Sequence, residues 1–137
     1  MAEGFSIEEM EVGQTASMSK TVSEADIDAF AAVTGDCSPI HVSADYAANS
    51  MFKQKIAHGM LSAGFISATI GTQLPGPGSV YLKQTLTFKG PVMIGDTVKT
   101  TATITSIKEK RKMLTIETIC TVDGKPVVVG EAWVMKP

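Results

Sequence analysis

The sequence has few of the residues that most often bind metals or form crosslinks. Its 137 residues include two cysteines, Cys37 and Cys120, and two histidines, His41 and His58. Two cysteines far apart in the chain are too few for a disulfide framework, and they do not form the closely spaced pair of a zinc site. Any chemistry that needs an imidazole must therefore use His41 or His58.

The chain also lacks an excess of positive charge. Twelve Lys and Arg residues stand against fourteen Asp and Glu residues, which gives a net charge of -2. This balance offers no overall electrostatic attraction for nucleic acid or for an anionic membrane surface. Hydrophobic residues make up 44% of the chain and charged residues 19%, which excludes a disordered chain and a coiled coil.

No segment is typical of a signal peptide or a membrane span. The first residues, Met1-Ala2-Glu3-Gly4, are acidic and lead into no apolar run. The stretch from Ile56 to Leu82 has no Lys, Arg, Asp or Glu, but it carries several polar residues and breaks at Pro75. A helix buried in a globular domain fits this stretch better than a span of about 20 apolar residues. We therefore expect a cytoplasmic protein with reduced cysteines.

The first half of the chain predicts one strand and three helices in a single domain. Thr15 to Val22 is predicted as a strand, and Ser23 is predicted to cap a helix that ends at Gly35. Residues 36–41 are predicted as an irregular loop, and a short helix follows through Ala48. The segment from Gly59 to Gln73 is apolar on all sides, which is typical of a buried helix. Three glycines in it, Gly59, Gly64 and Gly71, suggest close approach of another backbone or a ligand.

The second half changes to an alternating pattern that predicts strands. These strands cover 80–88, 98–107, 113–122 and 127–135, with a bulge near 104–107 and a tight hairpin at Asp123-Gly124. Sequential strands joined by short turns predict an antiparallel meander. The fold class is therefore α+β, with a curved sheet wrapped around one buried helix.

Asp36 and His41 are the most suggestive pair of side chains. They lie five residues apart in a loop bounded by Gly35 and containing Pro39, so both can point at one spot. A carboxylate and an imidazole together can hold a water, take its proton and deliver another. In the alternative interpretation, Asp36 only binds nearby backbone amides and His41 is a half-buried structural histidine.

Three further residues are weaker candidates. His58 and Gly59 begin the buried helix, whose first N–H groups could bind an oxygen that gains negative charge. Ser67, eight residues after Gly59, either faces a pocket or bonds a carbonyl one turn earlier. Cys37 is predicted to be a bystander, because the neighbouring carboxylate would raise the pKa of a thiol nucleophile.

These motifs together resemble the MaoC-like, or hydratase 2, family. The run Thr34-Gly35-Asp36-Cys37-Ser38-Pro39-Ile40-His41 is similar to the family pattern G-D-x-N-P-[LIV]-H, and Ala47 supplies the small residue six positions later. His58-Gly59-Met60 resembles the start of the family's central helix, and Phe88 to Asp96 resembles its F-x-x-P-V-x-x-G-D strand and turn. One position departs from the pattern, because Ser38 replaces the usual Asn and could hold the loop less firmly.

The resemblance implies one hot-dog domain over residues 1–137 that forms a homodimer and adds water reversibly to a trans-2-enoyl thioester. Asp36 and His41 would activate the water and protonate the α-carbon, in roles that the sequence leaves open. Gly59 would stabilise the thioester oxygen, with Ser67 and His58 supporting the pocket. The substrate would be an acyl-CoA or an acyl carrier protein, with no metal or other cofactor and no nucleic-acid or membrane partner. Two alternatives remain open at this point: a hot-dog thioesterase and a non-catalytic acyl-thioester-binding subunit.

Two further predictions concern substrate binding. The basic cluster of Lys108, Lys110, Arg111 and Lys112 either meets phosphates or an acidic carrier, or is a solvated hairpin end, which we favour. The acyl chain is predicted to run between the central helix and the sheet. Short chains of about four to six carbons are predicted, because the domain is small and has no second hot-dog unit to lengthen the tunnel. The walls are predicted to include Met60, Leu61, Phe65, Ile66, Leu86 and Phe88.

Overall fold

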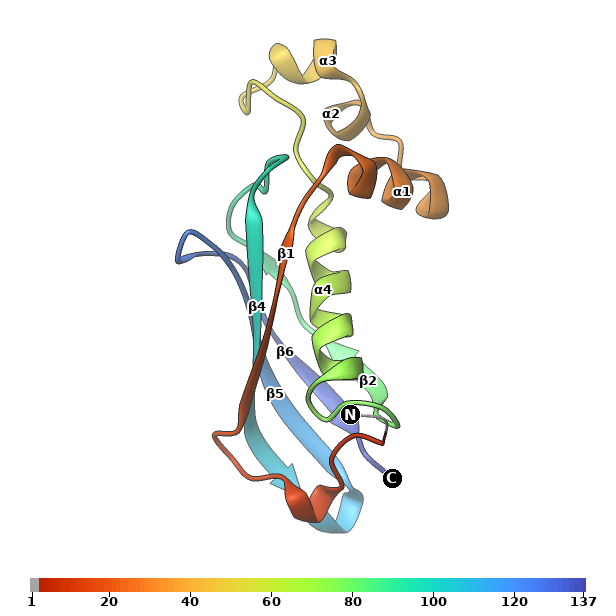
Figure 1. The fold of residues 1–137 in the computed structure, drawn as a ribbon, viewed down its shortest axis with the longest axis vertical. Coiled ribbons are helices and arrows are strands. Elements are labelled where there is room, and N and C mark those ends of the chain that lie inside the picture. The colour runs from red at the N-terminus through yellow and green to blue at the C-terminus, as the bar shows by residue number, and fades with distance from the viewer. Residues whose placement is uncertain (1–2) are drawn as a thin grey trace.

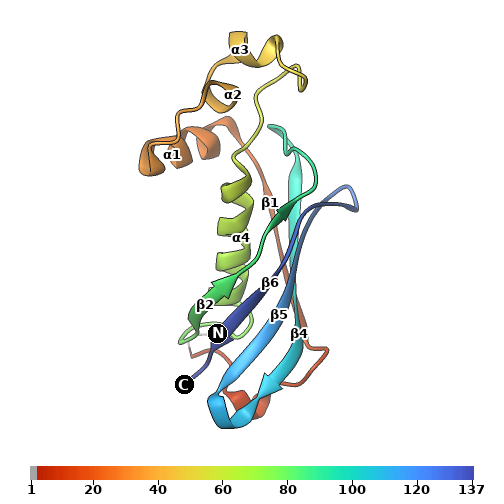
Figure 2. The same ribbon diagram turned by 180° about the vertical axis from the view of Figure 1, so that it is seen from behind.

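The structure is a computed structural model that describes residues 3–137 and contains one six-stranded antiparallel sheet. The strand order is β1-β4-β5-β6-β2, and the short strand β3 also pairs with β6. Figures 1 and 2 show the long strands curving around one helix, α4. The strands are β1 (Thr15–Thr21), β2 (Val80–Gln84), β3 (Thr87–Phe88), β4 (Thr97–Lys108), β5 (Met113–Val122) and β6 (Lys125–Met135).

The helix α4 (Gly59–Thr72) packs against the concave face of this sheet. Its residues Ile66 and Ile70 are fully buried and belong to the same apolar core as Ile104, Ile116 and Val134 of the sheet. Removing this apolar surface from water is the main force that holds helix and sheet together. The predicted α+β arrangement of a curved antiparallel sheet around a central helix is confirmed.

One face of α4 is not covered by the described part of the chain. Gly64 and Ser67 are exposed, and Met60 is 55% exposed. The prediction that the helix is buried on all sides is therefore wrong for this face. The uniform apolar pattern could not reveal it, because small residues such as Gly and Ala fit both a buried and an open helix face.

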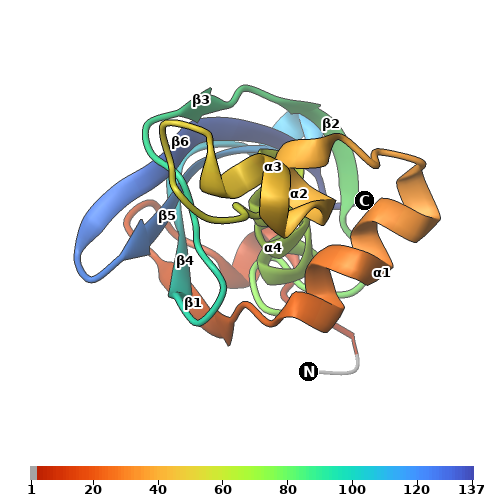
Figure 3. The same cartoon turned by 90° about the horizontal axis from the view of Figure 1, so that it is seen from above.

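The helices of the N-terminal half lie beyond the end of the sheet, above the N-terminus of α4 (Figures 1 and 3). They are α1 (Glu24–Thr34), α2 (Pro39–Val42) and α3 (Ala44–Ala48). At the start of α1, the Ser23 hydroxyl accepts from the Asp26 N–H, and the Asp26 carboxylate accepts from the Ser23 N–H. At its end, Gly35 has a φ of 81°, a left-handed conformation that glycine adopts without strain. Both predicted caps are confirmed.

Three details differ from the predicted elements. The loop predicted over residues 36–41 contains the short helix α2, which starts at Pro39 because proline suits the first helical position. The strand predicted over 80–88 is split into β2 and β3. It breaks where the Gln84 side chain turns inward and donates to the Thr85 carbonyl and the Thr118 hydroxyl.

The third difference concerns topology. Only β4, β5 and β6 form a meander, while β1 pairs with β4 and β2 pairs with β6 on the far side of the sheet. The long connection through α1–α4 carries the chain from one edge of the sheet to the other. The predicted bulge is present between Ile104 and Ser106, and the tight turn at Asp123-Gly124 has positive φ at both residues.

Within residues 3–137, no helix is both long enough and apolar enough to cross a bilayer. This agrees with the interpretation of the uncharged stretch from Ile56 to Leu82 as a packed helix followed by a turn.

At the end of the molecule opposite the α1–α3 helices, a buried lysine bonds two backbone carbonyls. Lys136 is 8% exposed, and its Nζ donates to the carbonyls of Pro77 at 2.6 Å and Glu3 at 3.2 Å. We expect Lys136→Met to lower the free energy of unfolding by about 1–3 kcal/mol, because both carbonyls lose a donor. Urea denaturation would measure this change. The exposed Lys99→Met serves as the control, and equal midpoints for the two variants would contradict the expectation.

Candidate active site

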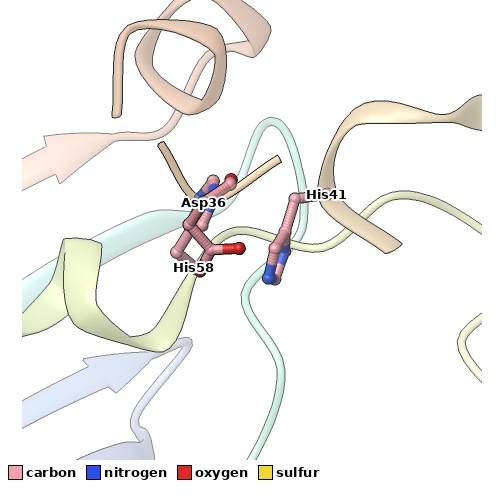
Figure 4. Close-up of side chains that lie close together, drawn as sticks. All are labelled: Asp36, His41 and His58. Atoms are coloured by element: carbon pink, nitrogen blue, oxygen red, sulfur yellow. The ribbon is translucent and has the colours of Figure 1, made fainter. Parts of the chain in front are cut away.

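The predicted catalytic residues come from two segments that meet at the N-terminus of α4. Asp36 lies in the loop that follows α1, and His41 lies in α2. His58 is the residue directly before α4. Figure 4 shows the three side chains close together, and one polar side-chain atom of each lies within 4.8 Å of those of the other two.

The Asp36 carboxylate is exposed and only partly used by its own loop. Its Oδ1 accepts from the Ser38 N–H at 3.3 Å, while the Asp36 N–H donates to the Thr34 hydroxyl at 3.1 Å. The Ser38 side chain makes no capping bond to α2. Asp36 therefore organises the loop, as the alternative interpretation held, but its Oδ2 has no partner among the described residues and is free for a ligand.

The His41 ring is half-buried, and one of its nitrogens is fixed. Its Nδ1 lies 2.7 Å from the carbonyl oxygen of Ile56. A carbonyl can only accept, so Nδ1 carries the hydrogen, and in the neutral ring Nε2 holds the free lone pair. Nε2 is therefore the atom of His41 that can take a proton from a water.

The backbone segment at residues 56–57, whose Ile56 carbonyl bonds His41, is itself bonded to a neighbouring loop. Ile56 forms an isolated antiparallel bridge with Met93, and the Ala57 N–H donates to the Val92 carbonyl at 2.8 Å. The His41 ring is thus linked through the backbone at residues 56–57 to the chain at 92–93.

The His58 ring is 2% exposed and lies against His41. The two ring centroids are 3.9 Å apart with an angle of 27° between the planes. His58 Nε2 lies 2.8 Å from the backbone carbonyl oxygen of Asp36. The sequence predicted His58 to support oxyanion or substrate binding, but its ring donor faces the protein backbone.

The three side chains could be considered as ligands of a metal ion, but the ring geometry does not fit. A metal bound to an imidazole lies in the plane of the ring, about 2 Å from the nitrogen. Nearly parallel rings stacked at 3.9 Å cannot both hold one ion in their planes. The arrangement suits proton transfer better than metal binding.

A cavity of about 630 Å³ opens beside these residues. Its lining is mostly apolar, with His41 and His58 at one side and the first turn of α4 at another. The lining residues are His41, Met51, Phe52, Ile56, Ala57, His58, Gly59, Met60, Ser62, Phe88, Lys89, Gly90, Pro91, Val92 and Val128.

Gly59 provides a backbone N–H group at the start of α4, and its lack of a side chain leaves room for the Phe88 ring. No side chain from the described residues caps this helix, so its first N–H groups are open to a ligand. A Cβ atom at Gly59 would lie 2.6 Å from the Phe88 ring. An added methyl group would therefore force either the exposed Phe88 ring or the helix to shift, whereas the sequence had predicted close approach of a backbone or a ligand at this position. At Gly64 and Gly71 an added Cβ meets nothing within 4 Å, so the close approach predicted there is absent from the described chain.

Asp36 does not line the cavity itself, although one of its carboxylate oxygens lies within 4.8 Å of a ring nitrogen of His41, which does. Three other predicted features lie away from this cavity. Ser67 is on the exposed face of α4 and does not line the cavity, so its supporting role stays a prediction. Cys37 is exposed and also outside the lining, as expected for a bystander. The basic cluster lies on the β4–β5 hairpin at the opposite end of the sheet (Figure 1), which supports the solvated interpretation.

Only two of the predicted acyl walls line this cavity, and the path of the acyl chain stays a prediction. Met60 and Phe88 line the cavity, whereas Leu61, Phe65, Ile66 and Leu86 belong to the packing of the core. Sequence reasoning missed Met51 and Phe52, which follow α3 and reach the cavity from the N-terminal half. Their signal was weak, since Met51 is one exposed apolar residue in an irregular segment.

The chain is similar in sequence to proteins of one known family. The family model described as "MaoC like domain" matches residues 8–125. The chain is 55% identical to an (R)-specific enoyl-CoA hydratase of Rhodospirillum rubrum, over 95% of this chain and 90% of that protein. It is 44% identical to a 3-hydroxybutyryl-CoA dehydratase of Methylorubrum extorquens, over 95% of this chain and 83% of that protein.

The fold has an equally clear match among solved structures. An (R)-hydratase from Pseudomonas aeruginosa in the unliganded form superposes with a TM-score of 0.93 and 45% identity. The match covers 98% of this chain and 86% of that one. The expected hot-dog arrangement is therefore confirmed by a relative with similar sequence as well as by the topology.

Proposed function

The chain belongs to the MaoC-like domain family, and on that premise we propose that it is an (R)-specific enoyl-CoA hydratase. The enzyme is a hydro-lyase that converts trans-2-enoyl-CoA and water into (R)-3-hydroxyacyl-CoA, reversibly. The observation that carries the site assignment is the convergence of Asp36 and His41 beside the free N-terminus of α4.

The reaction adds the elements of water across the C2–C3 double bond. The water oxygen forms a bond to C3 as one water proton passes to a base, and the π electrons move toward the thioester oxygen. The electrons then return as C2 takes a proton from an acid. No electrons leave the substrate, so we propose that no redox cofactor is required. We also propose that no metal is required, because the thioester already acidifies the α-position.

The geometry supports a role for each group. The lone pair at His41 Nε2 suits it to hold or deprotonate the water. A carboxylate oxygen of Asp36 lies within 4.8 Å of a His41 ring nitrogen, so the two side chains can share one water. The open N–H of Gly59, at the positive end of α4, suits the oxygen that becomes negative. These assignments distribute the acid, the base and the oxyanion donor among three residues near the N-terminal end of α4.

The test is an assay with crotonyl-CoA that separates the proposed activity from the alternatives. Hydration removes the enoyl absorbance without releasing a thiol, and chiral analysis should find the (R) product. Thiol release would identify a thioesterase, and binding without turnover would identify a non-catalytic subunit. The same assay with an enoyl carrier protein would show whether CoA or the carrier is the preferred form.

We also propose that the protein is a homodimer joined at the β2–β3 edge of its sheet. This edge exposes four large apolar residues, namely Val80, Tyr81, Leu82 and Phe88, each between 38% and 52% exposed. An unpaired strand edge with apolar side chains invites another chain. Light scattering is expected to give twice the 14.4 kDa chain mass, and Leu82→Lys is expected to shift the particle toward the monomer. A monomer at micromolar concentration would contradict this proposal.

The preferred acyl chain is expected to be short, about four to six carbons. Bulky side chains at Met51, Phe52 and Phe88 close in on the cavity beside the catalytic pair. Each added methylene is worth only about 1–3 kcal/mol in an apolar pocket, so the preference should fall in stages. A kcat/KM for a C10 enoyl-CoA above that for crotonyl-CoA would overturn this expectation. The cytoplasmic location expected from the sequence is likewise a proposal, which fractionation of cells would test.

A further inference from the structure

We infer that His58 is a positioning residue that fixes both members of the catalytic pair, one through a hydrogen bond and the other through its ring. The kinetic part of this inference rests on the proposed hydratase function. The structural part stands on the two histidine rings and does not depend on the substrate.

The hydrogen bond connects two segments that are distant in the chain. His58 Nε2 lies 2.8 Å from the carbonyl oxygen of Asp36, 22 residues earlier. Because the carbonyl can only accept, Nε2 is the protonated nitrogen of His58. This bond fastens the loop that carries the Asp36 carboxylate to the start of α4, where the Gly59 N–H lies.

The ring contact acts on the second member of the pair. The His58 ring stacks on one face of the His41 ring at a centroid distance of 3.9 Å. The Ile56 carbonyl accepts a hydrogen bond from Nδ1 at the edge of the His41 ring. Phe30 holds His58 in turn, with its ring edge-on at 4.7 Å and 82°. The direction of the His41 Nε2 lone pair is therefore set by two contacts, one of which is His58.

The remaining nitrogen of His58 shows why a histidine is needed at this position. Nδ1 is buried and has no hydrogen-bond partner among the described residues. A buried polar atom without a partner is uncommon and carries a cost. A phenylalanine would fill the space and stack on His41 without that cost, but it could not donate to the Asp36 carbonyl. The Nε2–H bond is therefore the property that the site requires.

This role differs from direct substrate contact. The only hydrogen on the neutral His58 ring nitrogens points at the Asp36 backbone, so it is not available to a thioester oxygen. Loss of His58 should therefore lower kcat by misplacing the catalytic groups and leave the binding of the substrate nearly unchanged.

Three substitutions separate the two contacts. His58→Phe keeps a ring under His41 but removes the donor, His58→Gln keeps a donor but removes the ring, and His58→Ala removes both. We expect His58→Phe to lower kcat for crotonyl-CoA by about 10–100-fold, since misplacement by about 1 Å can cost about 10² in rate. KM should stay within about twofold. His58→Ala should lose more than His58→Phe, and His58→Gln should recover part of the difference.

A matched control is available further along the same helix. Thr69 is fully buried, and its hydroxyl donates to the Phe65 carbonyl at 2.8 Å. Thr69→Val also removes a buried donor, about 15 Å along the helix from Gly59, and should lower stability without changing kcat. If His58→Phe behaves like Thr69→Val, or raises KM at constant kcat, the positioning role is wrong.

A second measurement remains valid even if the variants fold poorly or the substrate is another thioester. The chain has only two histidines, so a long-range ¹⁵N–¹H spectrum of the imidazoles at pH 8 contains two ring systems. His41→Ala assigns them by leaving His58 alone. We expect the hydrogen on Nε2 in His58 and on Nδ1 in His41. A His58 ring protonated at Nδ1 would overturn the inference, whereas a failure of wild-type protein to hydrate crotonyl-CoA would overturn only the proposed function.

Discussion

Replacing His41 with alanine, or Asp36 with asparagine, is expected to lower kcat for crotonyl-CoA hydration by about 10²–10⁴-fold. His41→Ala removes the Nε2 lone pair beside the cavity, and Asp36→Asn removes the charge while keeping the shape of the side chain. A positioned acid or base contributes about this much to rate. The double variant should be hardly worse than the single variants, because the two groups act on one water as a unit.

The control for these variants is a neighbour in the same loop. Cys37 stands between Asp36 and Ser38 in the chain. Its side chain is exposed and does not line the cavity. Cys37→Ser should keep nearly all of the activity, and circular dichroism should show that all four proteins are folded. A folded Asp36→Asn or His41→Ala enzyme that retains more than about a tenth of the wild-type kcat would remove that residue from the catalytic pair.

Adding a single methyl group at Gly59 is expected to reduce kcat about 10–100-fold. The new Cβ would lie 2.6 Å from the Phe88 ring, so the ring or the first turn of α4 must move. A shift of about 1 Å in the Gly59 N–H would misplace the donor for the developing oxyanion. Stopped-flow or steady-state assays of Gly59→Ala with crotonyl-CoA would measure this loss.

Two further proteins make the steric explanation testable. Gly71→Ala adds the same methyl group at the other end of α4, where nothing lies within 4 Å, and should leave kcat unchanged while adding up to about 1 kcal/mol of stability. In Gly59→Ala combined with Phe88→Ala, the clash is removed and much of the activity should return. If the double variant is as slow as Gly59→Ala, displacement by Phe88 is not the cause.

The sequence predicted most of the local structure because local rules governed it. The capping of α1 by Ser23 and its end at Gly35 depend on residues within a few positions, and so does the turn at Asp123-Gly124. The interruption between β2 and β3 could not be predicted in this way. It depends on the contact of Gln84 with Thr118, which is 34 residues away in the chain.

The same distinction applies to the site. Asp36 and His41 are only five residues apart in the chain, so their convergence could be proposed from spacing and from the resemblance of the motif. Stacking of His58 on His41 joins segments separated by α3 and an irregular stretch, and no periodic pattern encodes it. Met51 and Phe52 reach the cavity by a path that depends on how α3 is placed over α4, which the sequence alone does not specify.

The bridge between Ile56 and Met93 has a consequence for attempts to change substrate preference. The Ile56 carbonyl holds His41, and the backbone of residues 56–57 is bonded to the chain at 92–93, directly after the cavity wall at 88–92. The pocket wall and the His41 imidazole are thus joined through the bonded backbone segments 56–57 and 92–93. We expect a mutation that enlarges the pocket by shifting this wall to turn the His41 imidazole as well. Such a mutation would change turnover together with substrate selectivity. Mutations at Met51 or Phe52, which line the cavity but lie outside these bonded segments, are the better starting points for redesigning chain length.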